Sequence, residues 1–563
     1  MNSKNKPFYS AWRLYFVLLV TCFAVGGLIF RVFDLAILDQ YFLRHQGDER
    51  VLRLVNTPAF RGMIVDRNGF PLAVSTMVYS AWLNPKEFSY SKSALHTLGG
   101  LLGMQGKAIV GMVALNKQRK REFVYLKRSL TPDIAKQIKT LAIPGLYLQQ
   151  EYRRFYPEGE VTAQVIGFTN VDDQGQEGLE LTYNRWLSGE PGKRWVMKDR
   201  IGRMISDVQM VQDQKAGHDL VLSMDRRIQY LAYRELFSGV TQYHASAGSA
   251  IVLDANTGEI LAMVNYPSFN PNNRSLRRGD MMRNRAVTDL FEPGSTIKAF
   301  TVASALESRR YKTDSVIDTS PGWMRLDHHI VNDEKNNGLL SMTQILQHSS
   351  NMGAAKIVLS LPPNYLWNVL HRVGFGETTG IGFPGEQEGV LIKQSPWGSF
   401  MLATLSFGYS MSATALQLTR AYAVLANDGV KMPVTLLRLD DETNKKPAGE
   451  QVLRAEVAKQ MLLLLESVVL KGGTAKAARV PGYRVAGKTG TVKKIGAEGY
   501  QKHRYISSFV GVAPLSHPRV VVSVVIDDPR GKYYYGGDVA GPVFAKIMEG
   551  TLRILDVPPD TKE

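Results

Sequence analysis

Three short polar motifs that lie far apart in the sequence constrain the fold of this chain more than any other feature. They are Ser295-Thr296-Ile297-Lys298, Ser349-Ser350-Asn351 and Lys488-Thr489-Gly490-Thr491, in that order. Each motif alone is short enough to occur by chance in 563 residues. Together they supply a nucleophile, a base and a strand that can hold a substrate, the parts that an activated serine needs. The fold must therefore bring a helix start, a turn and a strand to one site.

The first motif places a serine and a lysine one helical turn apart. Residues 291–294 break the chain before Ser295, and the apolar spacing that follows predicts a helix over residues 296–306. Residues i and i+3 share a helix face, so Lys298 lies beside the Ser295 hydroxyl. A serine becomes nucleophilic when a base takes its proton, and a lysine is a base once burial lowers its pKa. Alone, this serine would be read as a helix N-cap.

The second motif follows a predicted helix over residues 342–348. Ser349 is placed to relay a proton between Lys298 and a leaving group, and Asn351 offers its amide to a substrate backbone and to Lys298. On its own, the motif would be a polar turn that caps the next helix.

The third motif lies in a predicted strand, residues 485–492, which contains Gly487 and Gly490. Glycine within a strand usually marks the close approach of another backbone. That suits a peptide substrate that adds alongside the strand. On its own, the motif would be an ordinary edge strand and turn.

Four residues of these motifs have expected roles in substrate binding. Lys488 is expected to supply positive charge, and the hydroxyls of Thr489 and Thr491 to bind a terminal carboxylate. The backbone N–H groups of Ser295 and Thr491 are expected to form an oxyanion hole.

An apolar segment near the N-terminus predicts a membrane anchor. Residues 14–30 carry no charge and span about 25 Å as a helix, and apolar positions extend the segment to residue 38. Lys4, Lys6 and Arg13 precede it, so the positive-inside rule leaves residues 1–13 in the cytoplasm. A cleaved signal peptide and a buried soluble helix are the alternatives.

Residues 39–215 are predicted to form a non-catalytic pedestal. Asn68-Gly69 predicts a β-hairpin. Residues 90–145 show helical spacing, with breaks expected at Gly99-Gly100 and Pro132. Two motifs, residues 153–159 and 175–180, are expected to form arginine–carboxylate pairs and turns.

Residues 216–563 are predicted to form the catalytic domain. A strand ends and a helix begins near Ser223 or Asp225, and a β-hairpin covers residues 250–264. The middle is mostly helical, and strands return at 483–492, 506–512 and 520–526. Strands, then helices, then strands in one sheet predict an α+β fold.

Charge and composition exclude several functions. The net charge of +17 is spread along the chain without a recognisable reader motif, which argues against nucleic acid and fits an anionic polymer or membrane surface. The one cysteine, Cys22, lies in the apolar segment, so no disulfide framework is expected. The histidines form no metal-binding pair, and we expect no metal.

With these motifs the chain resembles the class B penicillin-binding proteins, and among them the division-specific transpeptidases of Gram-negative bacteria. The likeness covers nearly the whole chain. It rests on residues 61–73, 153–159, 175–180, 283–298, 488–494, 534–537 and 542–544.

The resemblance implies a single transmembrane helix, an elongated α+β pedestal and a transpeptidase domain with an antiparallel sheet flanked by helices, as in serine β-lactamases. It implies that Ser295 attacks the penultimate D-alanine carbonyl of a pentapeptide stem, with Lys298 as base and no cofactor. The acyl group then passes to an amine of a neighbouring stem. β-Lactams imitate the D-Ala-D-Ala end.

The same resemblance implies a single-pass protein of the cell inner membrane with its catalytic domain in the periplasm. The implied partners are lipid-linked peptidoglycan, nascent glycan peptide stems, a septal glycosyltransferase and other division proteins. An elongation-specific class B transpeptidase is the nearest alternative function. A β-lactamase-type enzyme and a non-enzymatic β-lactam sensor are further alternatives, but neither accounts for the anchor and pedestal together.

Overall fold

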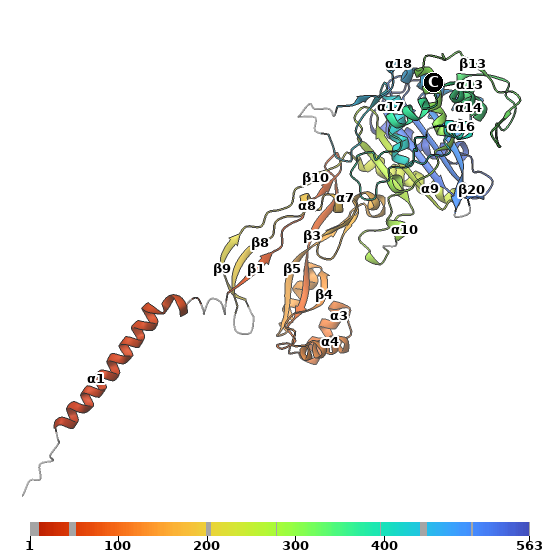
Figure 1. The fold of residues 1–563 in the computed structure, drawn as a ribbon. Helices are drawn as coiled ribbons and strands as arrows, with labels where there is room; N and C mark the ends of the chain where they lie inside the picture. The colour runs from red at the N-terminus through yellow and green to blue at the C-terminus, as the bar shows by residue number, and fades with distance from the viewer. Residues whose placement is uncertain are drawn as a thin grey trace, which may run out of the picture. The chain divides into compact units, whose positions relative to one another are not determined.

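The computed structural model describes residues 11–43, 45, 52–198, 204–276, 279–394, 396–439, 448–496 and 499–561 (Figure 1). The chain packs as two compact units. Unit one contains Met1–Phe60, Tyr79–Glu151 and Gly189–Ala216, and unit two contains Arg61–Val78, Tyr152–Ser188 and Gly217–Glu563. Strands β3 (Pro71–Leu83) and β5 (Leu146–Phe155) contribute residues to both units.

Unit one begins with the predicted apolar helix. Helix α1 (Ala11–Phe33) continues into a π-helical turn (η1, Asp34–Leu38), and no side chain of either is buried. Within the segment Ala11–Leu38 the mean hydropathy reaches 2.3 over 18 residues, and at 1.5 Å per residue the segment is about 42 Å long, enough to cross a bilayer. It fits a single-pass membrane anchor. Most of the predicted cytoplasmic tail, residues 1–10, lies outside the described residues.

The rest of unit one consists of a sheet and a small helical part. The antiparallel sheet has the order β1 (Leu52–Thr57), β8 (Gly192–Lys198), β9 (Met204–Gln212). The helical part contains α3 (Lys92–Leu102), α4 (Gly106–Gln118) and α5 (Pro132–Thr140), with strand β4 (Val124–Leu130) paired to β3. Its apolar core includes Leu83, Leu98, Leu102, Ile109 and Leu130.

Two predictions for residues 90–145 were wrong. The first helix runs through Gly99-Gly100 and ends at Gly103, which has a φ of +64° that glycine adopts without strain. A Cβ on Gly99 would lie 2.7 Å from a backbone oxygen, so this glycine allows close packing instead of breaking the helix. Residues 124–130, expected to be helical, form strand β4.

Unit two contains the predicted hairpin and the predicted arginine–carboxylate pairs. Strand β2 (Ile64–Val65) pairs with β3 around the Asn68-Gly69 turn, and β10 (Leu220–Val221) runs parallel to β2. Glu180 is fully buried and binds two arginines, with its oxygens 2.6 Å from Arg61 Nη2 and 2.6 Å from Arg154 Nε. Both predictions are confirmed.

The central sheet of unit two has five antiparallel strands in the order β12–β11–β21–β20–β19. The predicted hairpin joins β11 and β12 at one edge, and the third motif lies on β19 at the other edge. The strands are β11 (Ala247–Asp254), β12 (Ile260–Tyr266), β19 (Ala486–Gly496), β20 (Gly499–Ala513) and β21 (Val520–Asp527).

Helices pack against this sheet around one continuous apolar core. Helix α9 (Arg226–Gln242), capped by Asp225, one of the two predicted candidates, packs with α19 (Gly536–Ile554) and the sheet. Every residue of α17 (Ala415–Ala426) is buried, because this helix lies between strand β21 and α12 (Lys298–Glu307). The α+β prediction is confirmed, although α19 was missed by a sequence analysis that expected only strands near the C-terminus.

The remaining elements of unit two are short. They are β6 (Phe168–Thr169), β7 (Gly175–Glu177), α6 (Ala163–Ile166), α7 (Gly178–Thr182), α8 (Asn184–Leu187), α10 (Gly279–Met282), α11 (Arg285–Thr288), β13 (Val316–Asp318), β14 (Trp323–Leu326), β15 (His329–Asn332), β16 (Leu339–Ser341), α13 (Met342–Gln347), α14 (Asn351–Ser360), α15 (Tyr365–Arg372), α16 (Ser399–Ser406), β17 (Val430–Lys431), β18 (Glu450–Gln451) and α18 (Ala455–Glu466).

Candidate active site

The first motif forms a tight turn that leads into a helix. Gly294, Ser295 and Ile297 lie in a 3₁₀ turn (η4, Gly294–Ile297), and Lys298 is the first residue of α12. Ser295 does not cap α12, whose N-cap position is Ile297. Gly294 has a φ of +55°, and a Cβ there would lie 2.5 Å from Val492 on strand β19. Glycine therefore lets the nucleophile turn approach the substrate strand.

The amine of Lys298 is the centre of the site. Its Nζ lies 3.0 Å from Ser295 Oγ, 2.6 Å from the backbone oxygen of Ser349, 3.1 Å from Ser349 Oγ and 2.7 Å from Asn351 Oδ1. The side chain is about 1% exposed. The three motifs that predicted a shared site thus converge here, since Lys488 also reaches Ser349.

The contacts of Lys298 suit a neutral amine. A neutral amine donates two hydrogen bonds and keeps one lone pair, whereas an ammonium donates three and accepts none. The two shortest contacts go to the Ser349 carbonyl and to Asn351 Oδ1, which only accept. The lone pair is then free to take the proton of Ser295. Burial lowers the pKa of Lys298 to about 7, with the charges of Asp333 and Glu334 opposing that shift.

The second motif is held in an unusual turn. Ser349 has a φ of +55°, which is uncommon for a residue with a side chain. Ser350 caps α14 by accepting a hydrogen bond from the Gly353 N–H, so the capping role considered for this motif also applies. Asp333 accepts from Ser350 Oγ at 2.5 Å and from the Met352 N–H at 2.9 Å. These bonds fix the direction in which Ser349 and Asn351 point.

The third motif lies on edge strand β19 beside the nucleophile turn. A Cβ on Gly490 would lie 2.4 Å from Ser508 Oγ and 3.0 Å from the carbonyl oxygen of Pro293. Gly490 therefore allows close packing within the protein, and the addition of a peptide substrate alongside the strand stays a prediction. Thr491 Oγ1 accepts a hydrogen bond from the Gly536 N–H at 2.9 Å, and Thr489 Oγ1 lies 3.2 Å from Thr474 Oγ1.

Lys488 differs from the expectation that it supplies positive charge to the pocket. Its side chain is fully buried, and it donates to Ser349 Oγ at 3.1 Å and to Thr489 Oγ1 at 3.3 Å. Burial, and then repulsion by Lys298, lowers the pKa of Lys488 well below its ordinary value. This placement follows from the packing of β19, which leaves Lys488 beneath the surface of the pocket, hydrogen-bonded to Ser349.

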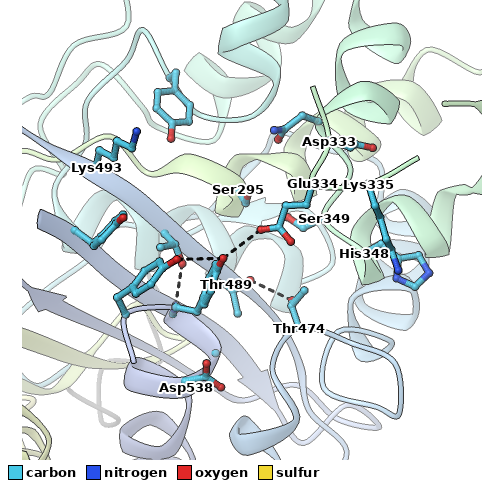
Figure 2. Close-up of a pocket in the computed structure, with 18 of the residues that line it drawn as sticks. Ser295, Asp333, Glu334, Lys335, His348, Ser349, Thr474, Thr489, Lys493 and Asp538 are labelled. Carbon is cyan, nitrogen blue, oxygen red and sulfur yellow. Dashed lines mark hydrogen bonds between the residues drawn. The ribbon is translucent and has the colours of Figure 1, made fainter. Parts of the chain in front are cut away.

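A pocket of about 640 Å³ opens over these residues (Figure 2). Five predicted site residues line it, and Lys298, Lys488 and Gly490 lie beneath its surface. The five are Ser295, Ser349, Asn351, Thr489 and Thr491. No group of three or more histidine, cysteine, aspartate or glutamate side chains that could hold a metal occurs among the described residues.

Sequence reasoning missed several residues of this pocket. Asp333, Glu334 and Thr474 line it from loops that carry no recognisable motif, and Asp538 lines it from the first turn of α19. The sequence pointed to this part of the pocket only through Tyr534-Tyr535-Gly536-Gly537, a motif that carries the family resemblance but was not assigned to the site.

Comparison with known proteins agrees with this geometry. The model of the penicillin-binding protein transpeptidase domain matches residues 248–549, and that of the penicillin-binding protein dimerisation domain matches residues 56–222. The chain is 42% identical to the peptidoglycan D,D-transpeptidase FtsI of Escherichia coli K12, over 98% of this chain and 93% of that protein. It is also 42% identical to the probable peptidoglycan D,D-transpeptidase PbpC of Pseudomonas aeruginosa, over 97% of this chain and 96% of that protein.

Solved structures show the same fold. The apo transpeptidase domain of Burkholderia pseudomallei penicillin-binding protein 3 is 41% identical, with a TM-score of 0.56 over 61% of this chain and 98% of that one. Penicillin-binding protein 3 of Mycobacterium tuberculosis, complexed with aztreonam, is 27% identical, with a TM-score of 0.69 over 90% of this chain and 98% of that one. The chain with this lysine-centred serine site therefore belongs to the class B penicillin-binding proteins.

Proposed function

We propose that this protein is a peptidoglycan D,D-transpeptidase that cross-links peptide stems through an acyl-enzyme on Ser295. The observation that carries the proposal is the 3.0 Å contact between Ser295 Oγ and the buried Lys298 amine. Family membership and the names of the relatives support the substrate, a stem that ends in D-Ala-D-Ala.

In the acylation step, Lys298 takes the Ser295 proton as Oγ attacks the penultimate D-alanine carbonyl. The bond from Oγ to the carbonyl carbon forms, and the peptide bond to the last D-alanine breaks. The proton passes from Lys298 through Ser349 Oγ, 3.1 Å away, to the leaving amine. An amine of a neighbouring stem then displaces Ser295 from the ester.

Strand β19 and Asn351 position the donor stem. Thr489 and Thr491 present hydroxyls to the terminal carboxylate, and Gly490 between them lets strand β19 pack closely against Ser508 and Pro293. The N–H groups of Ser295 and Thr491 stabilise the oxyanion, a contribution of about 3–4 kcal/mol per donor in related chemistry. β-Lactams acylate Ser295 in the same way, because their ring amide imitates the D-Ala-D-Ala bond.

Labelling with a fluorescent penicillin tests the nucleophile and the ligand class together. The wild-type protein should gain one penicillin on the peptide that contains Ser295, as located by mass spectrometry. Ser295→Ala should abolish the label while its unfolding temperature stays nearly unchanged, since Ser295 makes no capping bond. Labelling that survives in this variant would overturn the assignment.

The cellular setting follows from the anchor and the pedestal. Residues 1–13 face the cytoplasm, 14–38 cross the inner membrane, and the pedestal (39–215) and transpeptidase domain (216–563) lie in the periplasm. Basic residues before the anchor support this orientation. The anchor and pedestal offer surfaces for a glycosyltransferase of lipid-linked peptidoglycan and for other division proteins.

The name of the Escherichia coli relative, FtsI, is that of a division protein, which supports action at the septum. Depletion of the protein should give filaments, and a fluorescent fusion should gather at midcell. Round, swollen cells with a lateral signal would assign the chain to elongation and leave the site chemistry intact.

A further inference from the structure

One carboxylate in the pocket has no role in the acylation steps described above. Glu334 follows strand β15 and is exposed. Figure 2 shows its side chain turned into the pocket, on the side of Ser295 where Ser349 lies. Its Oε1 lies 3.5 Å from the hydroxyl of Tyr535, at the limit of a hydrogen bond. Among the described residues, no cation lies within ion-pair distance of Glu334.

The other acidic groups of the pocket are differently placed. Asp333 is nine-tenths buried, and its oxygens hold Ser350 and Met352. Asp538 is exposed on α19, and Figure 2 places it beyond Thr489 from Ser295. Glu334 is therefore the acid that is both exposed to a ligand and adjacent to the nucleophile.

The position of Glu334 works against acylation. Its negative charge raises the pKa of Lys298, which opposes the neutral form that the base needs. Tyr535 does not neutralise it, because a hydrogen bond with Tyr534, burial and the Glu334 charge all raise the pKa of that phenol, which stays protonated. The reaction has two halves, acylation of Ser295 and transfer of the acyl group to an amine. A charge that hinders acylation at this position points to a role for Glu334 in the transfer.

The second half-reaction requires an amine to reach the Ser295 ester. Alkyl amines have ordinary pKa values near 10, so the acceptor arrives as an ammonium. After acylation, the donor chain covers strand β19. The wall that carries Glu334 then remains open to the acceptor. Tyr535 faces Glu334 from the opposite wall, where the neighbouring Gly536 N–H donates to Thr491 of strand β19.

We propose that Glu334 is the acceptor subsite: its carboxylate binds the ammonium of the incoming stem and holds that nitrogen beside the acyl-enzyme. The inference rests on the proposed transpeptidase function and deepens it. The ammonium gives one proton to bulk water, and the neutral amine that results attacks the ester carbonyl with its lone pair. The carbon–nitrogen bond forms, the bond from the carbonyl carbon to Ser295 Oγ breaks, and the second amine proton reaches Oγ through Lys298.

The test separates a cationic acceptor from a neutral one. Full-length protein in detergent is given a thioester donor that ends in a D-alanyl thioester, with either Nα-acetyl-lysine amide or hydroxylamine as acceptor. The lysine side chain is cationic at neutral pH, and hydroxylamine is uncharged. Glu334→Gln should lower kcat/KM for the lysine acceptor about three- to fivefold, or ~0.7–1 kcal/mol, and change the hydroxylamine reaction less than twofold.

Two controls complete the experiment. Glu549→Gln removes an exposed carboxylate of α19 that does not line the pocket, and it should leave both acceptor reactions within twofold of wild type. Penicillin labelling of Glu334→Gln should match or exceed that of wild type, because acylation does not use this residue. Raising the salt concentration should slow the lysine reaction of wild type but not that of the variant.

The outcomes are distinguishable. Equal losses with both acceptors would overturn the subsite and assign Glu334 a structural or general-base role. An unchanged lysine reaction with normal labelling would overturn this inference and leave the proposed function standing. Failure of wild type to take up penicillin or consume the thioester would overturn the proposed function, and the subsite with it.

Discussion

Two of the sites where unit two buries charged residues differ in how those residues are held. In the pedestal segments, Arg61 and Arg154 bind the fully buried Glu180 at 2.6 Å each, and the first arginine also donates to Asn184 and Ser188. In the active site, the buried amines of Lys298 and Lys488 contact neutral oxygens only.

The difference separates charges that support the fold from groups that react. A buried ion that is paired and hydrogen-bonded keeps its charge and is chemically inert. A buried lysine without a carboxylate partner loses its proton instead, and it becomes a base. Arginine suits the first task because it stays protonated, and lysine suits the second because its pKa moves readily.

The largest effect, a loss of folding stability, is expected from disrupting the buried network of Glu180 and its two arginines. Glu180→Gln keeps the size of the side chain but leaves two buried arginines without their anion, which should cost about 3–5 kcal/mol. The unfolding temperature should fall steeply, while penicillin still labels the folded fraction because the network does not touch the site. Glu177→Gln, an exposed glutamate of the same motif, is the matched control. Equal stability of the two variants would show that the buried network contributes little.

The sequence predicted the parts of both sites that depend on local spacing. Ser295 and Lys298 are linked by the helical period, and the arginine–carboxylate pairs were expected from the pedestal motifs. Burial was not predictable in the same way. Lys488 is buried because β19 packs against β20 and because α19, far along the chain, closes over the strand.

Residues in loops were beyond sequence reasoning for a similar reason. A loop, strand β16 and helix α13 separate Asp333 from the second motif, so only the folded chain brings it to Ser350. Helix α19 was missed because it starts at Gly536-Gly537 and contains Pro542, residues that disfavour helices. Tertiary packing against α9 and the sheet overrides that local preference.

The next largest effect sharpens the contrast between the two basic residue types. Lys298→Arg places a permanently charged guanidinium where a neutral amine is needed, so acylation by penicillin should slow at least ~100-fold. Lys312→Arg, at an exposed position after α12, should label at the wild-type rate. Stopped-flow or gel-based labelling rates would decide the matter. Near-normal acylation by the Lys298 variant would assign the base to another residue.

The smallest effect is the pH dependence of acylation, and it follows from the same buried amine. Burial lowers the pKa of Lys298 from 10.5 to about 7, so the reactive neutral form predominates above pH 7. The rate of penicillin acylation should rise about tenfold per pH unit below 7 and level off near pH 8. Between pH 7 and 10.5 the unfolded lysine binds a proton that the folded one lacks, so the contribution of Lys298 to stability rises with pH across that window.

Glu334→Gln removes a charge that raises the pKa of Lys298, and it should move the midpoint of the rate profile to lower pH, whereas Glu180→Gln should leave that midpoint in place. A midpoint that moves with Glu180→Gln would show that the arginine network and Lys298 are coupled, and a midpoint that stays in place with Glu334→Gln would show that the Glu334 charge does not act on Lys298.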